Sequence, residues 1–308
     1  MPQKMRFGFM LFPFDRFERP QDFVEVAKVG EACGFHAVEL ADRLLLPRVA
    51  GKRFMNESWP DGITLAAYLA AATSTIRFLF NVRVVPWDSP FRLAKALATL
   101  DVVSAGRVLC GVGVGAHRDE FEQLGIPFDE RGRRLDRHLR VMKELWTSET
   151  PAFKDERFSF SNVSFRPKPV QQPHIPLLIG GSGPRPLRRV IELGDGWTPM
   201  RGTLQQVRDG IQWIRRTAQE AGRDPDSFHF GFNGLAVGVD EAVLKARRLA
   251  GDTAAVARER TAAETIAEIE GYRSAGVNYL TIVMPFRTPA EYAGKLEQFA
   301  REVLPSFA

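Results

Sequence analysis

One stretch of the 308-residue chain, LIGGSGP, has the residue types of an anion-binding turn. It joins a short apolar run to a segment that reads as a helix, with Pro184 in the first turn where proline is favoured. Glycine lets a backbone approach a ligand closely, and free amides at a helix start bind phosphate oxygens. The turn consists of Gly180, Gly181, Ser182 and Gly183. We predict that it binds a phosphate group, with added attraction from Arg185; a tight connection without a ligand is the alternative.

A second glycine pattern, GVGVG, covers Gly111–Gly115 at the end of another apolar run. Alternate glycines remove the side chains from one face of a strand, which leaves room for a flat ring against the backbone. Close packing against a neighbouring strand explains the same pattern. We include Val112 and Gly113 among the candidate cofactor contacts.

Four titratable side chains follow apolar runs and are candidates for catalysis. Asp42 and Arg43 are adjacent, and an acid or a guanidinium at that place can orient a ring or a substrate; a surface ion pair is the alternative. His117 titrates near neutral pH, which suits an acid–base group, although a lone loop histidine is commonly only solvated. Glu120 begins a predicted helix just after that loop, within reach of the same site.

Several familiar sites are excluded because their motifs are missing. The histidines and the two cysteines show no metal-ligand spacing, so we expect no metal. Neither a GxSxG elbow nor a GxxxxGK[ST] phosphate loop occurs. The turn after the first apolar run, Phe12–Asp15, lacks the glycines of a dinucleotide fingerprint. The cation-rich run Arg131–His138 fits a solvated helix face, with contact to an anion as the alternative.

The elements that would position these residues alternate along the chain. Eight apolar segments read as strands: Arg6–Leu11, His36–Ala41, Arg77–Val85, Arg107–Val112, Pro176–Gly180, Asp195–Pro199, Phe228–Val239 and Val277–Met284. Segments with helical spacing lie among them: Pro20–Cys33, Ile63–Ser74, Pro90–Ser104, Arg131–Ser148, Pro184–Leu193, Leu204–Ala221, Glu241–Gly251, Ala262–Ala275 and Pro289–Val303. This alternation predicts a parallel sheet, and eight such units predict its closure into a (β/α)8 TIM barrel.

One segment breaks the alternation. Pro151–Pro173 is rich in Phe, Pro and Lys and has short alternating runs, which predict an inserted hairpin or extended excursion. An open doubly wound sheet is the competing fold, and the strand count and the missing early fingerprint argue against it. We see no repeat or linker, so Met1–Ala308 is predicted to be a single barrel domain.

In such a barrel the active site gathers at the carboxyl ends of the strands. This rule adds five candidate contacts to the glycine residues. Phe12 follows the first strand, Asn81 and Val82 lie in the third, and Trp197 and Met200 lie at the end of the sixth. We expect all of them to surround one ligand.

Composition narrows the class of partner. The chain is 44% hydrophobic and carries 42 Lys and Arg against 37 Asp and Glu, a net charge of +5 that suits either an anionic ligand or a generic basic surface. The cations are interleaved with acids and form no known motif, which disfavours nucleic-acid binding. No run is long enough for a membrane helix, the N-terminus lacks a signal-peptide apolar region, and the two cysteines fit a reducing compartment. We expect a cytoplasmic enzyme with a small-molecule substrate and no membrane partner.

In their order and spacing, several segments resemble the luciferase-like monooxygenase superfamily, the flavin and deazaflavin oxidoreductases with the bacterial luciferase fold. The resemblance covers nearly the whole chain. Its carriers are FVEVAKVGEACGFHAVELAD from Phe23, IRFLFNVRVVPWDSP from Ile76, LDVVSAGRVLCGVGVGAHRDEFEQLG from Leu100, RRLDRHLRVMKELW from Arg133, PLLIGGSGP from Pro176 and ELGDGWTPM from Glu192.

The resemblance implies a flat tricyclic cofactor at the strand ends, with its phosphate at Gly180–Gly183. Many family members carry a non-prolyl cis peptide in the third strand behind the ring, which by position is Asn81–Val82. The resemblance also implies an insertion near the fifth strand, to which Pro151–Pro173 belongs. Relatives form homodimers through helices, and Pro90–Ser104 has an apolar stripe suited to this, which core packing explains equally well.

The subgroup features GSGP and ELGDGWTPM are similar to those of proteins that use coenzyme F420, a deazaflavin with a phosphate and a polyglutamate tail. We favour F420 because the basic net charge fits this anion, and FMN is the alternative. Relatives that oxidise alcohols or sugar phosphates have a histidine after the Asp that ends the second strand. Arg43 stands there instead, so the usual proton-abstracting residue is absent.

These features predict an F420-dependent oxidoreductase that transfers a hydride to or from a small organic substrate, for example in the reduction of an activated double bond or carbonyl. The first alternative is an FMN-dependent monooxygenase that uses reduced flavin and O2. The second is a non-catalytic barrel related to the luciferases.

Overall fold

The computed structural model describes residues 4–45, 58–237 and 261–308. Eight parallel strands close into a barrel in the order β1, β10, β9, β8, β7, β4, β3, β2. They are β1 (Arg6–Met10), β2 (Ala37–Leu40), β3 (Arg77–Val84), β4 (Val108–Gly113), β7 (Leu177–Gly180), β8 (Gly196–Thr198), β9 (His229–Ala236) and β10 (Tyr279–Val283). The predicted (β/α)8 barrel is confirmed.

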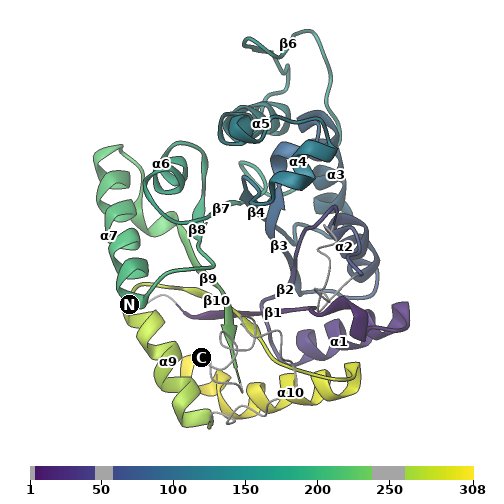
Figure 1. Cartoon of the computed structure of the whole chain (residues 1–308), viewed down its shortest axis with the longest axis vertical. Helices are drawn as coiled ribbons and strands as arrows, with labels where there is room; N and C mark the ends of the chain where they lie inside the picture. The colour runs from purple at the N-terminus through teal and green to yellow at the C-terminus, as the bar shows by residue number, and fades with distance from the viewer. Residues whose placement is uncertain (1–3, 46–57, 238–260) are drawn as a thin grey trace.

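Helices surround the strands on the outside (Figure 1). They are α1 (Pro20–Ala32), α2 (Gly62–Ala70), α3 (Pro90–Val103), α4 (Arg118–Gln123), α5 (Arg131–Thr147), α6 (Pro184–Leu193), α7 (Leu204–Glu220), α9 (Ala262–Ser274) and α10 (Pro289–Glu302). Short 3-10 turns lie at Phe14–Arg16, Val85–Trp87, Phe128–Glu130, Pro225–Ser227 and Leu304–Phe307. The local sequence fixes some helix starts: Thr203 and Gln206 form a capping box at α7, and Thr261 and Glu264 form one at α9.

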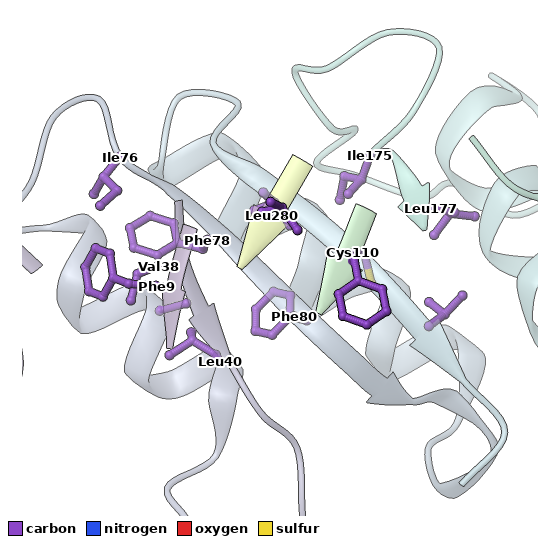
Figure 2. Packing of buried hydrophobic residues seen from close by; sticks show 14 of the residues in the cluster. Phe9, Val38, Leu40, Ile76, Phe78, Phe80, Cys110, Ile175, Leu177 and Leu280 are labelled. Carbon is purple, nitrogen blue, oxygen red and sulfur yellow. The ribbon is translucent and has the colours of Figure 1, made fainter. Parts of the chain in front are cut away.

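Apolar side chains on the outer faces of the strands form the main core between the barrel and its helices. Phe9, Val38, Phe78 and Leu280 are fully buried in it, as the close-up in Figure 2 shows. The backbone of α1 packs directly on β1, because a Cβ at Gly30 would lie 2.1 Å from the Phe9 ring. This core uses most of the strand residues that the apolar runs predicted.

The barrel interior changes character along its axis. Ala37, Leu79, Leu109, Leu178 and Tyr279 form a separate apolar cluster. Residues two positions further along a strand point the same way. Glu39, Asn81 and Thr281, two positions after Ala37, Leu79 and Tyr279, form a buried polar layer nearer the carboxyl ends together with Thr198 and Asn233. The interior therefore becomes polar toward the end of the barrel where a catalytic site is expected.

The excursion contains the predicted hairpin, made of β5 (Phe153–Lys154) and β6 (Ser159–Phe160). It projects beyond α5 in Figure 1 and precedes the fifth barrel strand, β7. The predicted helix Glu241–Gly251 lies outside the described residues.

The apolar stripe on α3 serves the core of this chain. Leu93, Ala94, Leu97 and Leu100 are at most 3% exposed. Phe91 is exposed by 37%, and its ring contacts those of the hairpin residues Phe158 and Phe160. Core packing accounts for this stripe, and the homodimer stays a prediction.

Candidate functional site

An arginine on β3 binds three carboxylates where β2 and β3 end. Arg83 Nη1 donates to Asp42 Oδ1 at 3.1 Å and to Asp61 Oδ2 at 3.3 Å. Its Nη2 donates to Asp88 Oδ2 at 2.9 Å, and the Val84 N–H donates to Asp42 Oδ2 at 3.1 Å. We call Arg83, Asp42, Asp61 and Asp88 the Arg83 cluster. Both oxygens of Asp42, a predicted catalytic residue, are therefore occupied by the protein itself.

Burial and opposite charge act against each other in the Arg83 cluster. The side chains of Asp42 and Arg83 are only 9% and 11% exposed. Burial raises the pKa of Asp42 to about 6, while Arg83 and the Val84 N–H oppose that shift. Burial by itself would lower the pKa of Arg83, but the neighbouring carboxylates raise it. At neutral pH the pair is ionised, and its chemical role is to fix the strand ends rather than to supply a free base.

The other three predicted catalytic residues meet each other. Arg43 Nη1 lies 2.9 Å from His117 Nε2, and Arg43 Nε lies 3.6 Å from Glu120 Oε1. A guanidinium has only donors, so Nε2 of His117 accepts and the ring proton is on Nδ1. The Glu120 side chain is 1% exposed, and Oε1 also accepts from the N–H groups of Leu44 and Leu45 at 3.3 and 3.2 Å. Glu120 thus fixes the start of the loop after β2 and holds Arg43 beside the His117 ring.

The third strand carries the bulge that the resemblance implied. The Asn81–Val82 peptide bond is cis, and the register between β3 and β4 shifts at this point. A Cβ at Gly113 or at Gly180 would lie 2.6 Å from a methyl group of Val82. The glycines at the ends of β4 and β7 therefore make room for Val82. For Gly113 of the GVGVG run, this is the close packing against a neighbouring strand that the sequence analysis gave as one explanation. Val82, Gly113 and Gly180 form one contiguous surface.

Glu39 is a buried acid that sequence analysis did not single out. It is fully buried in the polar layer, and Asn81 Nδ2 donates to its Oε2 at 3.2 Å and to Thr198 Oγ1 at 3.2 Å. Among the described residues, its Oε1 has no hydrogen-bond partner. Burial raises the pKa of Glu39 to about 7, against nearby hydroxyl and amide groups that favour its anion. The available signal was a glutamate at an inward position of the apolar run AVEL.

The glycine turn has backbone conformations that favour glycine. Gly181 and Gly183 have φ values of +95° and +94°, which side chains rarely adopt. Trp197, predicted to contact the cofactor, is 3% exposed, and its indole N–H donates to Gly181 O at 2.8 Å. Trp197 therefore supports the turn from within the barrel wall.

Three backbone donors of the turn are left without a partner among the described residues. The N–H groups of Ser182, Gly183 and Arg185 donate to none of the described residues. The first turn of α6 offers few other amides, because Pro184 and Pro186 carry no N–H. The Ser182 hydroxyl donates to the backbone carbonyl of Arg201 at 2.9 Å. The backbone fits a phosphate, and side-chain cations must supply much of the attraction.

The remaining predicted contacts lie further out. Val112 is fully buried in the outer core. Phe12 packs in an aromatic group with Phe14 and Trp59. Met200 is 60% exposed. The structure brings the glycine turn and Val82 together, and it leaves Phe12 and Met200 outside that contiguous surface.

In residues 4–45, 58–237 and 261–308, no group of three or more His, Cys, Asp or Glu residues is placed to hold a metal ion. No helix in these ranges is long and apolar enough to cross a membrane.

Comparison with known proteins gives one family. A family model described as luciferase-like monooxygenase matches residues 5–298. An uncharacterised protein of Mycobacterium tuberculosis (strain ATCC 25618 / H37Rv) is 31% identical over 233 residues, 71% of this chain and 80% of that protein. The FMNH2-dependent dimethylsulfone monooxygenase of Pseudomonas putida is 28% identical over 183 residues, 58% of this chain and 49% of that protein.

Solved structures share the whole fold. The monooxygenase RslO1 from Streptomyces bottropensis superposes with a TM-score of 0.80 and 24% identity, covering 99% of this chain and 100% of that one. The coenzyme F420 dependent tetrahydromethanopterin reductase from Methanopyrus kandleri gives 0.77 and 18%, covering 99% and 100%. At these identities the likeness shows the fold alone.

Proposed function

The chain belongs to the luciferase-like monooxygenase family, and we propose that it is an F420-dependent oxidoreductase that transfers a hydride between the deazaflavin and a small organic substrate. Its relatives and structural neighbours include both FMNH2-dependent and F420-dependent proteins, so membership alone does not select the cofactor. The observation that favours F420 over FMN is the positive charge beside the glycine turn. Arg185 and Arg188, on the first turns of α6, have no ion pair with any described residue. F420 is more anionic than FMN because it carries a polyglutamate tail.

In this proposal the phosphate binds at the glycine turn. The free N–H groups of Ser182, Gly183 and Arg185 supply donors, and the Arg185 side chain supplies charge. The surface of Val82, Gly113 and Gly180 adjoins the turn and backs the ring. When bound, F420 supplies a hydride carrier with little oxygen chemistry.

The residues after β2 act on the substrate. The Arg43 side chain is 18% exposed, so its guanidinium can donate to a developing negative charge on a carbonyl oxygen. Glu120 and His117 hold that guanidinium in place. Leu44 is 52% exposed and offers an apolar contact beside it. This arrangement suits the reduction of a polarised double bond, because the protein supplies a fixed cation and no free base.

Equilibrium binding of each cofactor to the purified chain tests the proposal. F420 is expected to bind, and Gly183→Ala is expected to weaken it, because that residue has a φ of +94°. Tight FMN binding with no measurable F420 affinity would instead support the FMN-dependent monooxygenase. Failure to bind either cofactor would support the non-catalytic barrel.

A further inference from the structure

A cleft of about 610 Å³ opens between the start of α5 and the start of α6. Arg131 and Arg133 line one wall, and Arg185 and Arg188 line the other. We call it the arginine cleft. The two helices are neighbours outside β4 and β7 in Figure 1. Pro186 joins the cleft to the glycine turn, because it lines the cleft and a Cβ at Gly181 would lie 3.2 Å from it.

Most acidic groups in the walls are already paired. Asp136 accepts two hydrogen bonds from Arg189, which links α5 to α6. Asp129 pairs with Arg118 at 3.4 Å. This leaves Glu192 as the acidic lining residue without an ion pair among the described residues, in a cleft lined by four arginines.

The four arginines have few partners of their own. Arg185 and Arg188 form no hydrogen bond or ion pair with a described residue, and Arg133 only reaches Glu130, at 4.0 Å. Arg131 lies 3.7 Å from the centroid of the Phe128 ring, and its Nη1 donates to Phe128 O at 2.8 Å, while its Nε is buried without a described acceptor. Four positive charges that line one cleft repel each other, and an anion bound there would offset that repulsion.

The cleft has room for more than one anionic group. Its volume of about 610 Å³ is far larger than one phosphate needs. Arginines stand on two separate helices, so they suit several anionic groups spread along a chain. The fork of a guanidinium matches a carboxylate with two hydrogen bonds.

We propose that the arginine cleft binds a flexible chain of several carboxylates that continues from the phosphate at the glycine turn. This inference rests on the proposed function, because the polyglutamate tail of F420 has that chemistry. The cleft then sets cofactor specificity, because FMN ends at its phosphate and leaves the cleft without an anionic occupant.

The test compares F420 carrying several glutamates with its tail-less form and with FMN, by fluorescence titration at low and high salt. We expect the tailed form to bind about tenfold more tightly at low salt, since several exposed ion pairs add up to that factor. High salt should remove most of the difference because it screens exposed charges.

The double variant Arg133→Glu/Arg188→Glu should bind both forms of F420 equally. Arg216→Glu, an exposed substitution on α7, is the matched control and should retain the tenfold preference. Equal affinities for the two forms in the unmodified chain, or a preference that survives in the double variant, would overturn the inference. Binding of FMN without either form of F420 would overturn the proposed function instead, so the two failures are distinguishable.

Discussion

Arginine serves opposite purposes at two places on the same rim of the barrel. At the ends of β2 and β3, Arg83 binds three carboxylates, and its side chain is 11% exposed. Beyond β7, Arg185 and Arg188 stand on α6 without a described partner. A charge that is already neutralised fixes a structure, whereas an unpaired one attracts a ligand. We therefore infer a rigid support in the first region and propose a binding surface in the second.

Arg43 lies between these extremes. It contacts Glu120 and His117, yet 18% of its side chain remains exposed. This is the arrangement expected of a cation that is held in place and still reaches a substrate.

Replacement of Arg83 with Met tests the support region most strongly. It leaves Asp42 buried without its counter-charge, so we expect a loss of about 3–5 kcal/mol in the free energy of unfolding. Urea unfolding measures this loss. The double variant Arg83→Met/Asp42→Asn should recover part of it, because no unpaired charge then remains. A loss below about 0.5 kcal/mol would mean that this arginine does not hold the strand ends.

The pH dependence of the free energy of unfolding tests the role of Glu39 in the polar layer. Its folded pKa of about 7 is above the ordinary 4.5, so the native state binds more protons than the unfolded state between these values. The free energy of unfolding therefore falls as pH rises through that window, by about 3 kcal/mol from this residue. Burial of Asp42 acts in the same direction up to about pH 6.

Urea unfolding at several pH values between 5 and 8 checks this. Glu39→Gln should flatten the profile between pH 6 and 8, where Asp42 contributes little. The exposed substitution Glu220→Gln should leave the profile unchanged. An unaltered slope in Glu39→Gln would show that this carboxyl does not titrate in the folded protein.

Gly183→Ala tests the shape of the binding region. Its φ of +94° and ψ of −178° belong almost only to glycine, and no atom lies within 4 Å of an added Cβ. The cost is therefore one of backbone conformation, about 1–3 kcal/mol. It should appear as lower stability or weaker cofactor binding in matched titrations. Retention of both would mean that the turn relaxes freely.

Removal of a cation from the binding region should have the smallest effect on folding. Arg185→Ala is expected to change the free energy of unfolding by less than about 0.5 kcal/mol, because its side chain has no described partner. The affinity of the Arg185→Ala variant for the cofactor should fall, measured on the same preparation. A stability loss comparable to that of Arg83→Met would erase the contrast between the two regions.

Much of the fold follows from local sequence. Apolar runs alternate with segments of helical spacing, and this order was sufficient to predict eight strands and their closure. The glycine turn was predictable for the same reason, because positive φ values at Gly181 and Gly183 are a local requirement. The hairpin in Pro151–Pro173 was also visible in its alternating runs.

Only the tertiary structure decided which charges meet. Asp42 pairs with Arg83 and not with its neighbour Arg43, because the parallel pairing of β2 with β3 sets the ends of these two strands side by side. Glu39 became a buried acid, and the arginines of α5 and α6 became two walls of one cleft, for the same reason. Periodicity specifies the shape of each element, whereas pairing, burial and pKa depend on residues that are distant along the chain and adjacent only after folding.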